Sequence, residues 1–300
     1  MKYILSNEIS KENLDKINSL TMRYSNLKLK IIDASFMNEL FIDKLNKENK
    51  FNSLVKGEFG RLFLGGLIDD DIEKILYLDC DTIVEGDLNE LFNTNLEDNY
   101  VGGIIEFFNI ILIKILHLNP CANCINSGVL LINLKKWRED NLEGKFLNEI
   151  NKYIDNPNLN DQSLINKVLQ CRIKILHPKY NYGPCKFRQR LYRFAYKLNK
   201  GKYYSKDQIM ESPIIIHFIT NKPWFENITI PLKNRFLYYK NISPFKNNSL
   251  RQFKEYNGFK TGIISIMEIF LKDPVFTPLT VYFFRYKNEK TVKKNWSLDE

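Results

Sequence analysis

The sequence predicts an α/β fold in which a mostly parallel sheet is flanked by helices. Strand and helix patterns alternate through the first half of the 300 residues. Residues 74–78 and 125–134 are apolar runs of the kind found in buried strands. The hydrophobic content of 44% is enough to bury a full core.

Local patterns justify the individual elements. Residues 27–32 alternate apolar side chains with lysine, which indicates a half-buried strand. Ser10 can cap a helix whose apolar face holds Leu14, Ile17 and Leu20. Further strands are expected at residues 2–5, 74–78, 100–105, 125–134, 172–176 and 213–216, and further helices at 58–67, 88–92, 135–155 and 161–169.

Composition narrows the class of protein. The net charge of +9 favours an anionic partner, which leaves nucleic acid, a membrane surface and a phosphorylated ligand open. The five cysteines argue against a disulfide framework and for a reducing compartment. Cys121 and Cys124 form a single C-x-x-C, too few ligands for structural zinc. Because the sequence shows neither a signal peptide nor a membrane span, we expect a cytoplasmic location.

Two carboxylates follow the strand at residues 74–78. Asp79 and Asp81 stand two positions apart, so they point the same way at the carboxyl end of the strand, where open α/β sheets bind ligands. Oxygen ligands favour Mg²⁺ or Mn²⁺. The alternatives are a solvated turn and a haloacid-dehalogenase-like phosphatase. In the phosphatase, Asp79 would be the nucleophile, although Ile83 stands where a Thr or Val is usual and the expected glycine is absent.

A set of motifs, in order and spacing, closely resembles retaining glycosyltransferase family 8 over roughly residues 1 to 240. The family implies a GT-A-like (Rossmann-like) fold and transfer of a sugar from a nucleotide donor. The motifs are Arg61-Leu62-Phe63-Leu64, Leu76-Tyr77-Leu78-Asp79-Cys80-Asp81, Gly86-Asp87-Leu88 with Leu91, Asn126-Ser127-Gly128-Val129-Leu130-Leu131-Ile132-Asn133-Leu134, Trp137-Arg138, Asp161-Gln162-Ser163-Leu164-Ile165-Asn166, Tyr180-Asn181, His217-Phe218 and Lys222-Pro223-Trp224.

The resemblance implies a role for each site residue. Asp79, Asp81 and His217 would hold Mn²⁺ (or Mg²⁺), while Asp161 and Gln162 would lie at the donor sugar near the reacting carbon. Glu106 stands about where the family often has a sugar-binding aspartate, so its longer side chain puts that contact in question. The donor-binding residues implied are Arg61, Asp79, Cys80, Asp81, Glu106, Asn126 and Lys222.

The expected activity is that of a retaining hexosyltransferase, which moves glucose or galactose from a UDP-sugar to a lipopolysaccharide-like surface-glycan acceptor. Both candidate acids are committed to metal, so same-face attack is favoured over a double displacement. The family normally has one more strand and helix before the segment resembling Tyr3–Ser6, and this chain has no counterpart. A start codon placed too far downstream, or an inactive homologue with impaired donor binding, would explain that departure.

Two tracts differ from the α/β pattern. Residues 186–206 hold eight Lys or Arg and no acid, interleaved with aromatic side chains. This tract fits a helix at an anionic membrane surface or a solvated basic helix, and nucleic acid is the least favoured partner. A lipid-linked glycan acceptor at the inner face of the membrane would suit the first reading. Residues 246–300 form a basic aromatic appendage after the main domain at residues 1–245.

Overall fold

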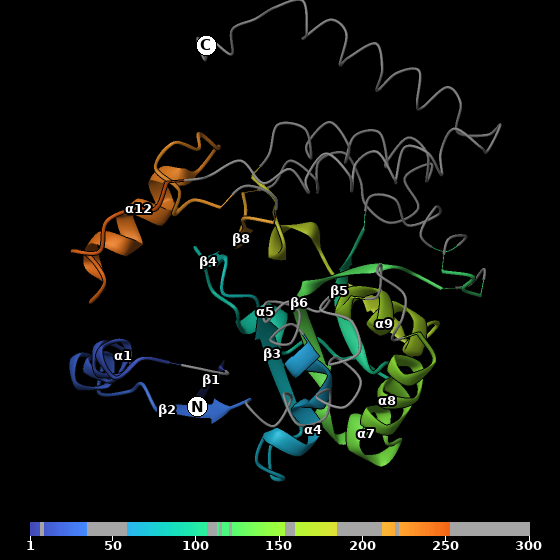
Figure 1. Ribbon diagram of the computed structural model, residues 1–300. Helices are drawn as coiled ribbons and strands as arrows, with labels where there is room; N and C mark the ends of the chain where they lie inside the picture. Colours follow the sequence, from blue (N-terminus) through green and yellow to red (C-terminus); the bar gives the residue numbers. More distant parts are fainter. Residues whose placement is uncertain are drawn as a thin grey trace, which may run out of the picture. The chain divides into compact units, whose positions relative to one another are not determined.

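The computed structural model describes residues 1–6, 9–34, 59–106, 113, 116–119, 122–153, 160–184, 212–219 and 222–252 (Figure 1). The chain divides into two compact units, Met1–Arg251 and Gln252–Glu300, and the description below concerns the first. The basic tract at residues 186–206 and nearly all of the predicted appendage lie outside the described residues. The predicted domain boundary at residue 245 therefore stays a prediction.

A β-α-β unit opens the chain, as predicted. Strands β1 (Lys2–Ser6) and β2 (Leu29–Asp33) pair in parallel, and helix α1 (Lys11–Arg23) connects them. Ser10 caps this helix, because its side chain accepts a hydrogen bond from the Asn13 backbone N–H. Tyr3 on β1 donates its hydroxyl to Asp69, which ties the unit to the loop before the next strand.

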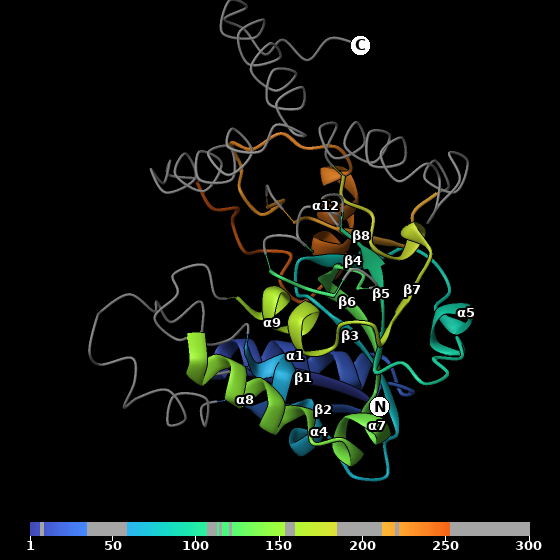
Figure 2. The same cartoon turned by 90° about the vertical axis from the view of Figure 1, so that its right-hand side faces the viewer.

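A four-stranded sheet forms the centre, in the order β3-β6-β5-β7 (Figure 2). Its strands are β3 (Lys74–Leu78), β6 (Ile125–Asn133), β5 (Val101–Ile105) and β7 (Ile173–Ile175). Strand β6 runs antiparallel to both β3 and β5, and only the β5–β7 pair in this sheet is parallel. The predicted helix-flanked α/β fold is confirmed, but the prediction of a mostly parallel sheet is wrong for these strands.

The strand direction was predicted wrongly because an apolar run indicates burial and not direction. Along β6, Leu130 and Ile132 belong to one hydrophobic cluster, whereas Val129 and Leu131 belong to another. The strand is therefore apolar at every position because both faces of the sheet are covered. Burial on two faces is common to both strand directions in this sheet, so the pattern predicted the strand and left its direction undetermined.

Helices pack against one of these two clusters. Trp137 of α7 (Leu134–Glu139), Phe146 of α8 (Leu142–Tyr153) and Leu164 of α9 (Asp161–Val168) all belong to it. Leu62 joins them from the 3₁₀ helix η1 (Gly60–Phe63), which α4 (Leu64–Leu67) follows. Figure 2 shows α7, α8 and α9 as the green and yellow-green ribbons beside the sheet.

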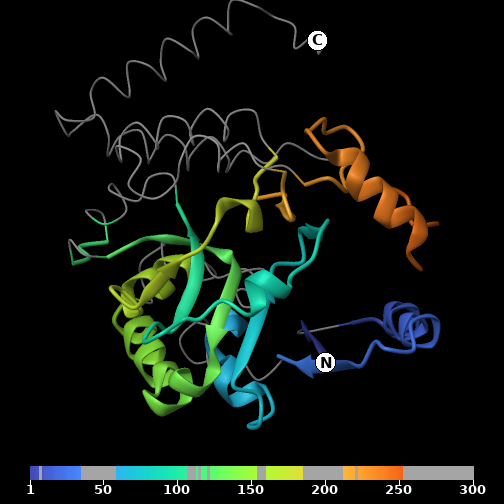
Figure 3. The ribbon, with the colours of Figure 1, turned by 180° about the vertical axis from the view of Figure 1, so that it is seen from behind.

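The other cluster joins the sheet to later parts of the chain. It contains Leu91 of α5 (Asn89–Phe92), Tyr180 of η2 (Pro178–Tyr180) and Ile215 of β8 (Ile215–His217). Strand β8 pairs antiparallel with β4 (Thr82–Val84), and this short ribbon is followed by α12 (Lys233–Ile242), drawn in orange in Figure 3. Across the described residues, every helix falls short of the length and apolar character that crossing a bilayer requires.

Three local features differ from the predictions. The helix predicted at residues 135–155 breaks between α7 and α8 at Asn141, whose left-handed φ of 46° stops a helix. The helix predicted at residues 161–169 ends one residue earlier, since α9 spans Asp161–Val168, and Asn160 caps its start with Ser163 completing a capping box. Cys171 is disulfide-bonded, although the cysteine count argued against a disulfide framework. An odd number of cysteines does not exclude a single bridge beside free thiols such as Cys80.

Candidate metal and donor site

The two carboxylates of the D-x-D segment sit on a tight turn between β3 and β4. Asp79 closes the turn, because its carbonyl oxygen accepts from the Thr82 N–H at 3.2 Å and from the Thr82 hydroxyl at 2.7 Å. The Asp79 N–H donates to Gly128 O at 2.8 Å, which anchors the start of the turn on β6. Cys80 lies exposed between the two acids. The turn thus presents Asp79 and Asp81 together at the end of β3.

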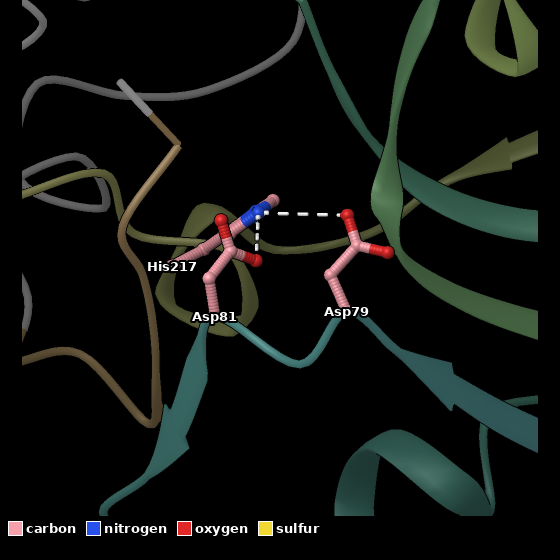
Figure 4. A group of neighbouring side chains, drawn as sticks. All are labelled: Asp79, Asp81 and His217. Carbon is pink, nitrogen blue, oxygen red and sulfur yellow. Dashed lines mark ion pairs between the residues drawn. The ribbon is translucent and has the colours of Figure 1, made fainter. Parts of the chain in front are cut away.

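His217 joins this pair through the β4–β8 ribbon. Its backbone is in register with Thr82, directly beside Asp81. The His217 Nε2 atom lies 3.1 Å from Asp81 Oδ1 and 3.7 Å from Asp79 Oδ2 (Figure 4). The histidine is buried, at 3% exposed. The structure therefore brings together the three residues for which metal binding was predicted.

The donor set fits a divalent cation. Among the described residues, Asp79, Asp81 and His217 each offer one ligand atom, and these three atoms lie within 4.8 Å of one another. Carboxylate oxygens with one imidazole nitrogen suit Mn²⁺ and, less closely, Mg²⁺. The wall behind them has no spare room. A Cβ on Gly128 would lie 2.1 Å from His217 Cε1 and 2.8 Å from Asp79 Oδ2.

Lys222 holds the other oxygen of Asp81. Its ammonium group bonds to Asp81 Oδ2 and donates to the carbonyl oxygens of Phe218 at 3.1 Å and Ile219 at 3.2 Å. Desolvation raises the pKa of Asp81, but the hydrogen bonds and charges of His217 and Lys222 outweigh it and lower the pKa to about 2. Asp81 is consequently ionised at neutral pH, as a metal ligand must be.

Arg61 lies between two acids. Its Nη2 is 2.9 Å from Asp79 Oδ1, its Nε is 3.1 Å from Asp161 Oδ2, and its Nη1 donates to Ser127 O at 2.9 Å. The residue is only 6% exposed. Desolvation nevertheless raises the pKa of Asp161, because the opposing charge of Arg61 does not offset it fully. Arg61 therefore connects the metal-facing acid to the acid at the start of α9.

Tyr77 belongs to the predicted motif before Asp79, but no role in the site was predicted for it. Its hydroxyl donates to Asp79 Oδ1 at 2.8 Å, and its ring lies 4.6 Å from the Arg61 guanidinium. Burial raises the pKa of the tyrosine, so the hydroxyl stays a proton donor. Its position two residues before Asp79, on the same strand face, is the signal that could have indicated it.

Amide side chains line the remaining part of the site. Asn126 donates through Nδ2 to Glu106 Oε1 and to Gln162 Oε1, each at 3.0 Å. Its Oδ1 accepts from the Gly128 N–H at 3.1 Å and from Asn181 Nδ2 at 2.8 Å. These four bonds use the full capacity of one amide group. Asn126 is therefore the centre of a polar network in which Glu106 and Gln162 are held.

Gln162 is oriented by the same network. Its Oε1 also accepts from the Ser127 N–H at 3.2 Å. Because a backbone N–H can only donate, this bond fixes which end of the amide is oxygen. Asn166 adds support from one turn further along α9, since its Nδ2 donates to Gln162 O at 2.8 Å. The network of predicted site residues thus centres on the first residues of β6, Asn126 to Gly128, and Asn166 and Asn181 are partners whose roles the motifs did not reveal.

The fold and this site define a class of enzyme. The crystal structure of the galactosyltransferase LgtC, solved with donor and acceptor sugar analogs, superposes with a TM-score of 0.65. The similarity covers 86% of this chain and 87% of LgtC at 22% sequence identity, which establishes the GT-A fold of glycosyltransferases. The family follows from the sequence itself. The family "Glycosyl transferase family 8" matches residues 1–228, and the chain belongs to it.

Characterised and putative relatives agree with that membership. A putative glycosyltransferase of Haemophilus influenzae is 31% identical over 186 residues, which is 61% of this chain and 54% of that protein. The lipopolysaccharide 1,2-glucosyltransferase of Escherichia coli is 25% identical over 253 residues, covering 82% of this chain and 70% of that protein. The chain spans about half the length of the first relative and more of the second. It is a glycosyltransferase of family 8.

Proposed function

We propose that this enzyme transfers glucose or galactose from a UDP-sugar to a surface-glycan acceptor, with retention of configuration and with Mn²⁺ as cofactor. The observation that carries the proposal is the convergence of two carboxylates and an imidazole nitrogen, with Lys222 beside them, at the end of β3. The E. coli relative named as a lipopolysaccharide glucosyltransferase supports a lipopolysaccharide-like acceptor.

Each residue of the metal end has a defined task in this proposal. Asp79, Asp81 and His217 would hold the ion, and a bound divalent cation neutralises charge on a departing diphosphate. The ammonium group of Lys222 would leave Asp81 and bind a phosphate oxygen of the donor, because a diphosphate carries more negative charge than a carboxylate. Arg61 would keep Asp79 in place, since its guanidinium holds the oxygen that faces away from His217.

The sugar end would be built from α9 and β6. Asp161 would accept hydrogen bonds from sugar hydroxyl groups. Gln162 would donate hydrogen bonds from its Nε2, because its Oε1 already accepts from Ser127 and Asn126. Glu106 would accept as well. Asn126 would touch the donor sugar directly only by giving up one of its four internal bonds, so we assign it chiefly to holding Gln162 and Glu106.

Same-face attack by the acceptor is the mechanism we favour for retention. A double displacement needs a free carboxylate beside the anomeric carbon. Asp161 is held by Arg61 and Glu106 by Asn126, while Asp79 and Asp81 face His217. The same contacts argue against the phosphatase alternative, since Asp79 Oδ1 is bound by both Arg61 and Tyr77. A glycosyl adduct trapped on any of these side chains would contradict the mechanism.

We also propose that the enzyme binds peripherally to a membrane surface. Helix α12 exposes Tyr238 at 53% and Ile242 at 44%, and it also contains Lys233 and Lys240, whose ammonium groups donate to backbone carbonyl oxygens in this structure. Apolar and basic side chains together suit an anionic lipid surface. Flotation with vesicles of phosphatidylglycerol should carry the protein upward, and flotation with phosphatidylcholine alone should not. Absence of binding to both would remove this part.

The test of the main proposal is UDP release from a panel of UDP-sugars, with and without Mn²⁺, beside a generic phosphate ester. We expect Mn²⁺-dependent UDP release and no ester turnover. His217→Ala should lower the rate by roughly 100-fold or more, because a ligand and its electrostatic effect are lost together. Glu97→Gln, at an exposed carboxylate outside the site, is the matched control and should keep full activity. Ester turnover alone, or UDP release that ignores Mn²⁺, would refute the proposal.

A further inference from the structure

Asn181 lies directly behind the metal ligand His217. Its Oδ1 is 2.8 Å from His217 Nδ1, and its Nδ2 donates to Asn126 Oδ1 at 2.8 Å. Asn181 is only 1% exposed. It follows the turn η2, and the Tyr182 N–H next to it donates to Ile215 O, so its backbone is fixed against β8. Asn181 thus joins the metal end of the site to the amide network on β6.

The direction of this hydrogen-bond chain is set at its far end. The Gly128 N–H can only donate, and it bonds to Asn126 Oδ1. On the other side, Glu106 Oε1 accepts from Asn126 Nδ2 at 3.0 Å. Two independent partners therefore fix the orientation of Asn126, which by coordinates alone could be flipped.

The orientation of Asn126 determines that the His217 Nδ1 atom carries a proton. Since Asn126 Oδ1 faces Asn181, the group of Asn181 on that side must be the donor Nδ2. The opposite group, Oδ1, then faces His217 Nδ1 and accepts its proton. An imidazole that binds a cation is neutral and has one N–H and one lone pair. With the proton kept on Nδ1, the lone pair that His217 offers to a cation is on Nε2, the atom that faces Asp79 and Asp81.

Building on the proposed metal-dependent function, we propose that Asn181 is a positioning residue that holds His217 as its Nδ1–H tautomer, with the Nε2 lone pair aimed at the cation. The two carboxylates alone would leave ring rotation and tautomer free. Partners of this kind behind a metal-bound histidine typically change metal affinity about 10–100-fold when removed. Asn181 needs no contact with donor, acceptor or ion to have this effect.

Two substitutions separate positioning from mere packing. Asn181→Leu has a similar size but cannot accept the Nδ1 proton, so Mn²⁺ affinity should fall about 10–100-fold. Asn181→Asp keeps an acceptor for Nδ1–H while losing the bond to Asn126, so Mn²⁺ affinity should stay within about threefold of wild type. Asn166→Leu is the control for loss of a buried amide. Asn166 is equally buried and bonds to Ile125 and Gln162 rather than to His217.

The measurement is titration of the full chain with MnCl₂, followed by electron paramagnetic resonance of free Mn²⁺, with pulsed spectra for ¹⁴N coupling from a bound histidine and a melting temperature for every variant. We expect the ¹⁴N coupling in wild type and Asn181→Asp, and its loss in Asn181→Leu and His217→Ala. Asn166→Leu should lower the melting temperature and leave Mn²⁺ affinity unchanged.

The contrary outcomes are distinct. If Asn181→Leu binds Mn²⁺ as wild type does, or if Asn181→Asp loses as much affinity as Asn181→Leu, Asn181 is a packing residue only and this inference fails. If wild type itself binds no Mn²⁺, or binds it without ¹⁴N coupling, the proposed metal site fails first, and the role of Asn181 fails with it.

Discussion

One guanidinium serves two carboxylates in this site, the buried Asp161 and the partly buried Asp79. Arg61 lies against Asp79 and Asp161 at 2.9 Å and 3.1 Å, so one charge must stabilise two opposite charges. Asp161 receives the smaller benefit, and desolvation leaves its pKa above the ordinary value of 3.8. A carboxyl group whose pKa is raised on folding binds more protons in the folded state, so it destabilises the fold when it is ionised. Asp161 is therefore retained at a cost in stability.

Asp161→Asn should relieve that cost. The side chain keeps its shape, and Arg61 keeps Asp79. We expect the melting temperature of the variant at pH 7 to equal or exceed that of wild type, by an amount on the order of 1 kcal/mol or 2–4 °C, while glycosyl transfer is lost. The advantage should appear as pH rises above about 3.8 and vanish below it. The readout is thermal unfolding with chelator between pH 3.5 and 8.

The control for this substitution is Asp15→Asn on the exposed side of α1, which should change the melting temperature little at any pH. A variant at Asp161 that is less stable than wild type at pH 7 would show that the Arg61 pairing outweighs desolvation.

Lys222 competes with the cation for Asp81. In the described structure it bonds to Asp81 Oδ2 and to two carbonyl oxygens, so an incoming metal ion must weaken this pair. Lys222→Met removes the competitor at similar length. We expect Mn²⁺ affinity without nucleotide to rise about 5- to 10-fold, consistent with an ion pair worth about 1 kcal/mol, while UDP-sugar turnover falls. Calorimetric titration with MnCl₂ measures the first effect.

Lys179→Met is the matched control for the Lys222 variant, because Lys179 pairs with the exposed Glu90 at 2.9 Å, away from the acids of the site. Its Mn²⁺ affinity should equal that of wild type. Weaker Mn²⁺ binding in Lys222→Met would mean that Lys222 orders Asp81 for the ion instead of competing with it.

At the scale of elements, β6 controls the site more than any other strand. Its first positions supply Asn126, the Ser127 carbonyl oxygen bonded to Arg61, and Gly128, whose missing side chain makes room for His217. The strand is paired on both edges, with β3 and β5. The backbone of β6 therefore has little freedom to move aside when a residue there grows.

Gly128→Ala should damage the site more than the fold. The new methyl group would meet His217 Cε1 at 2.1 Å and Asp79 Oδ2 at 2.8 Å, so the imidazole must rotate out. We expect Mn²⁺ affinity and UDP release to fall about 100-fold, with a loss of about 1–3 kcal/mol in stability. Gly86→Ala is the control, since its nearest neighbour is the Ile214 side chain at 3.4 Å. Full activity in Gly128→Ala would show that His217 is not needed where the structure has it.

Local sequence patterns predicted most helices and strands. They did not predict the direction of a strand or a helix break that depends on a single residue. Residues 74–78 were predicted as a strand and form β3 with the same bounds, because the apolar run is bounded by charged residues. The break of the predicted helix at Asn141 depends on one left-handed φ angle. The strand predicted at residues 213–216 overlaps β8, whereas its partner β4 was not predicted, because three residues are too few for a periodic pattern to show.

At the scale of the whole molecule, the residues of the site could be predicted better than their connections. The motifs indicated Asp79, Asp81 and His217, which the structure brings within 4.8 Å, although 136 positions separate the last two in sequence (217 − 81). The bonds of Asn126 and Asn181 could not be predicted, because a buried asparagine has the same sequence signature whether it binds a ligand or another side chain. Only the three-dimensional structure shows that Asn126 uses its full bonding capacity internally.

Ligands should stabilise the whole protein jointly. Under the proposed function, UDP and Mn²⁺ at about 100 times their dissociation constants would add about 2.7 kcal/mol to the stability of the folded state, which corresponds to ~5–10 °C for a domain of this size. We expect neither UDP with chelator nor Mn²⁺ alone to reach this shift in differential scanning fluorimetry. His217→Ala should show no joint shift. Equal shifts with and without Mn²⁺ would indicate that the nucleotide binds independently of the cation.

The pairing of β4 with β8 has a consequence for synthesis of the chain. Asp79 and Asp81 leave the ribosome long before His217, and Thr82 meets His217 only when β8 closes the ribbon. Until then the two acids form an incomplete version of the proposed metal site. Under the proposed function, tight Mn²⁺ binding would therefore report that β8 has paired with β4, so metal capture would mark the moment at which the nascent chain completes its site.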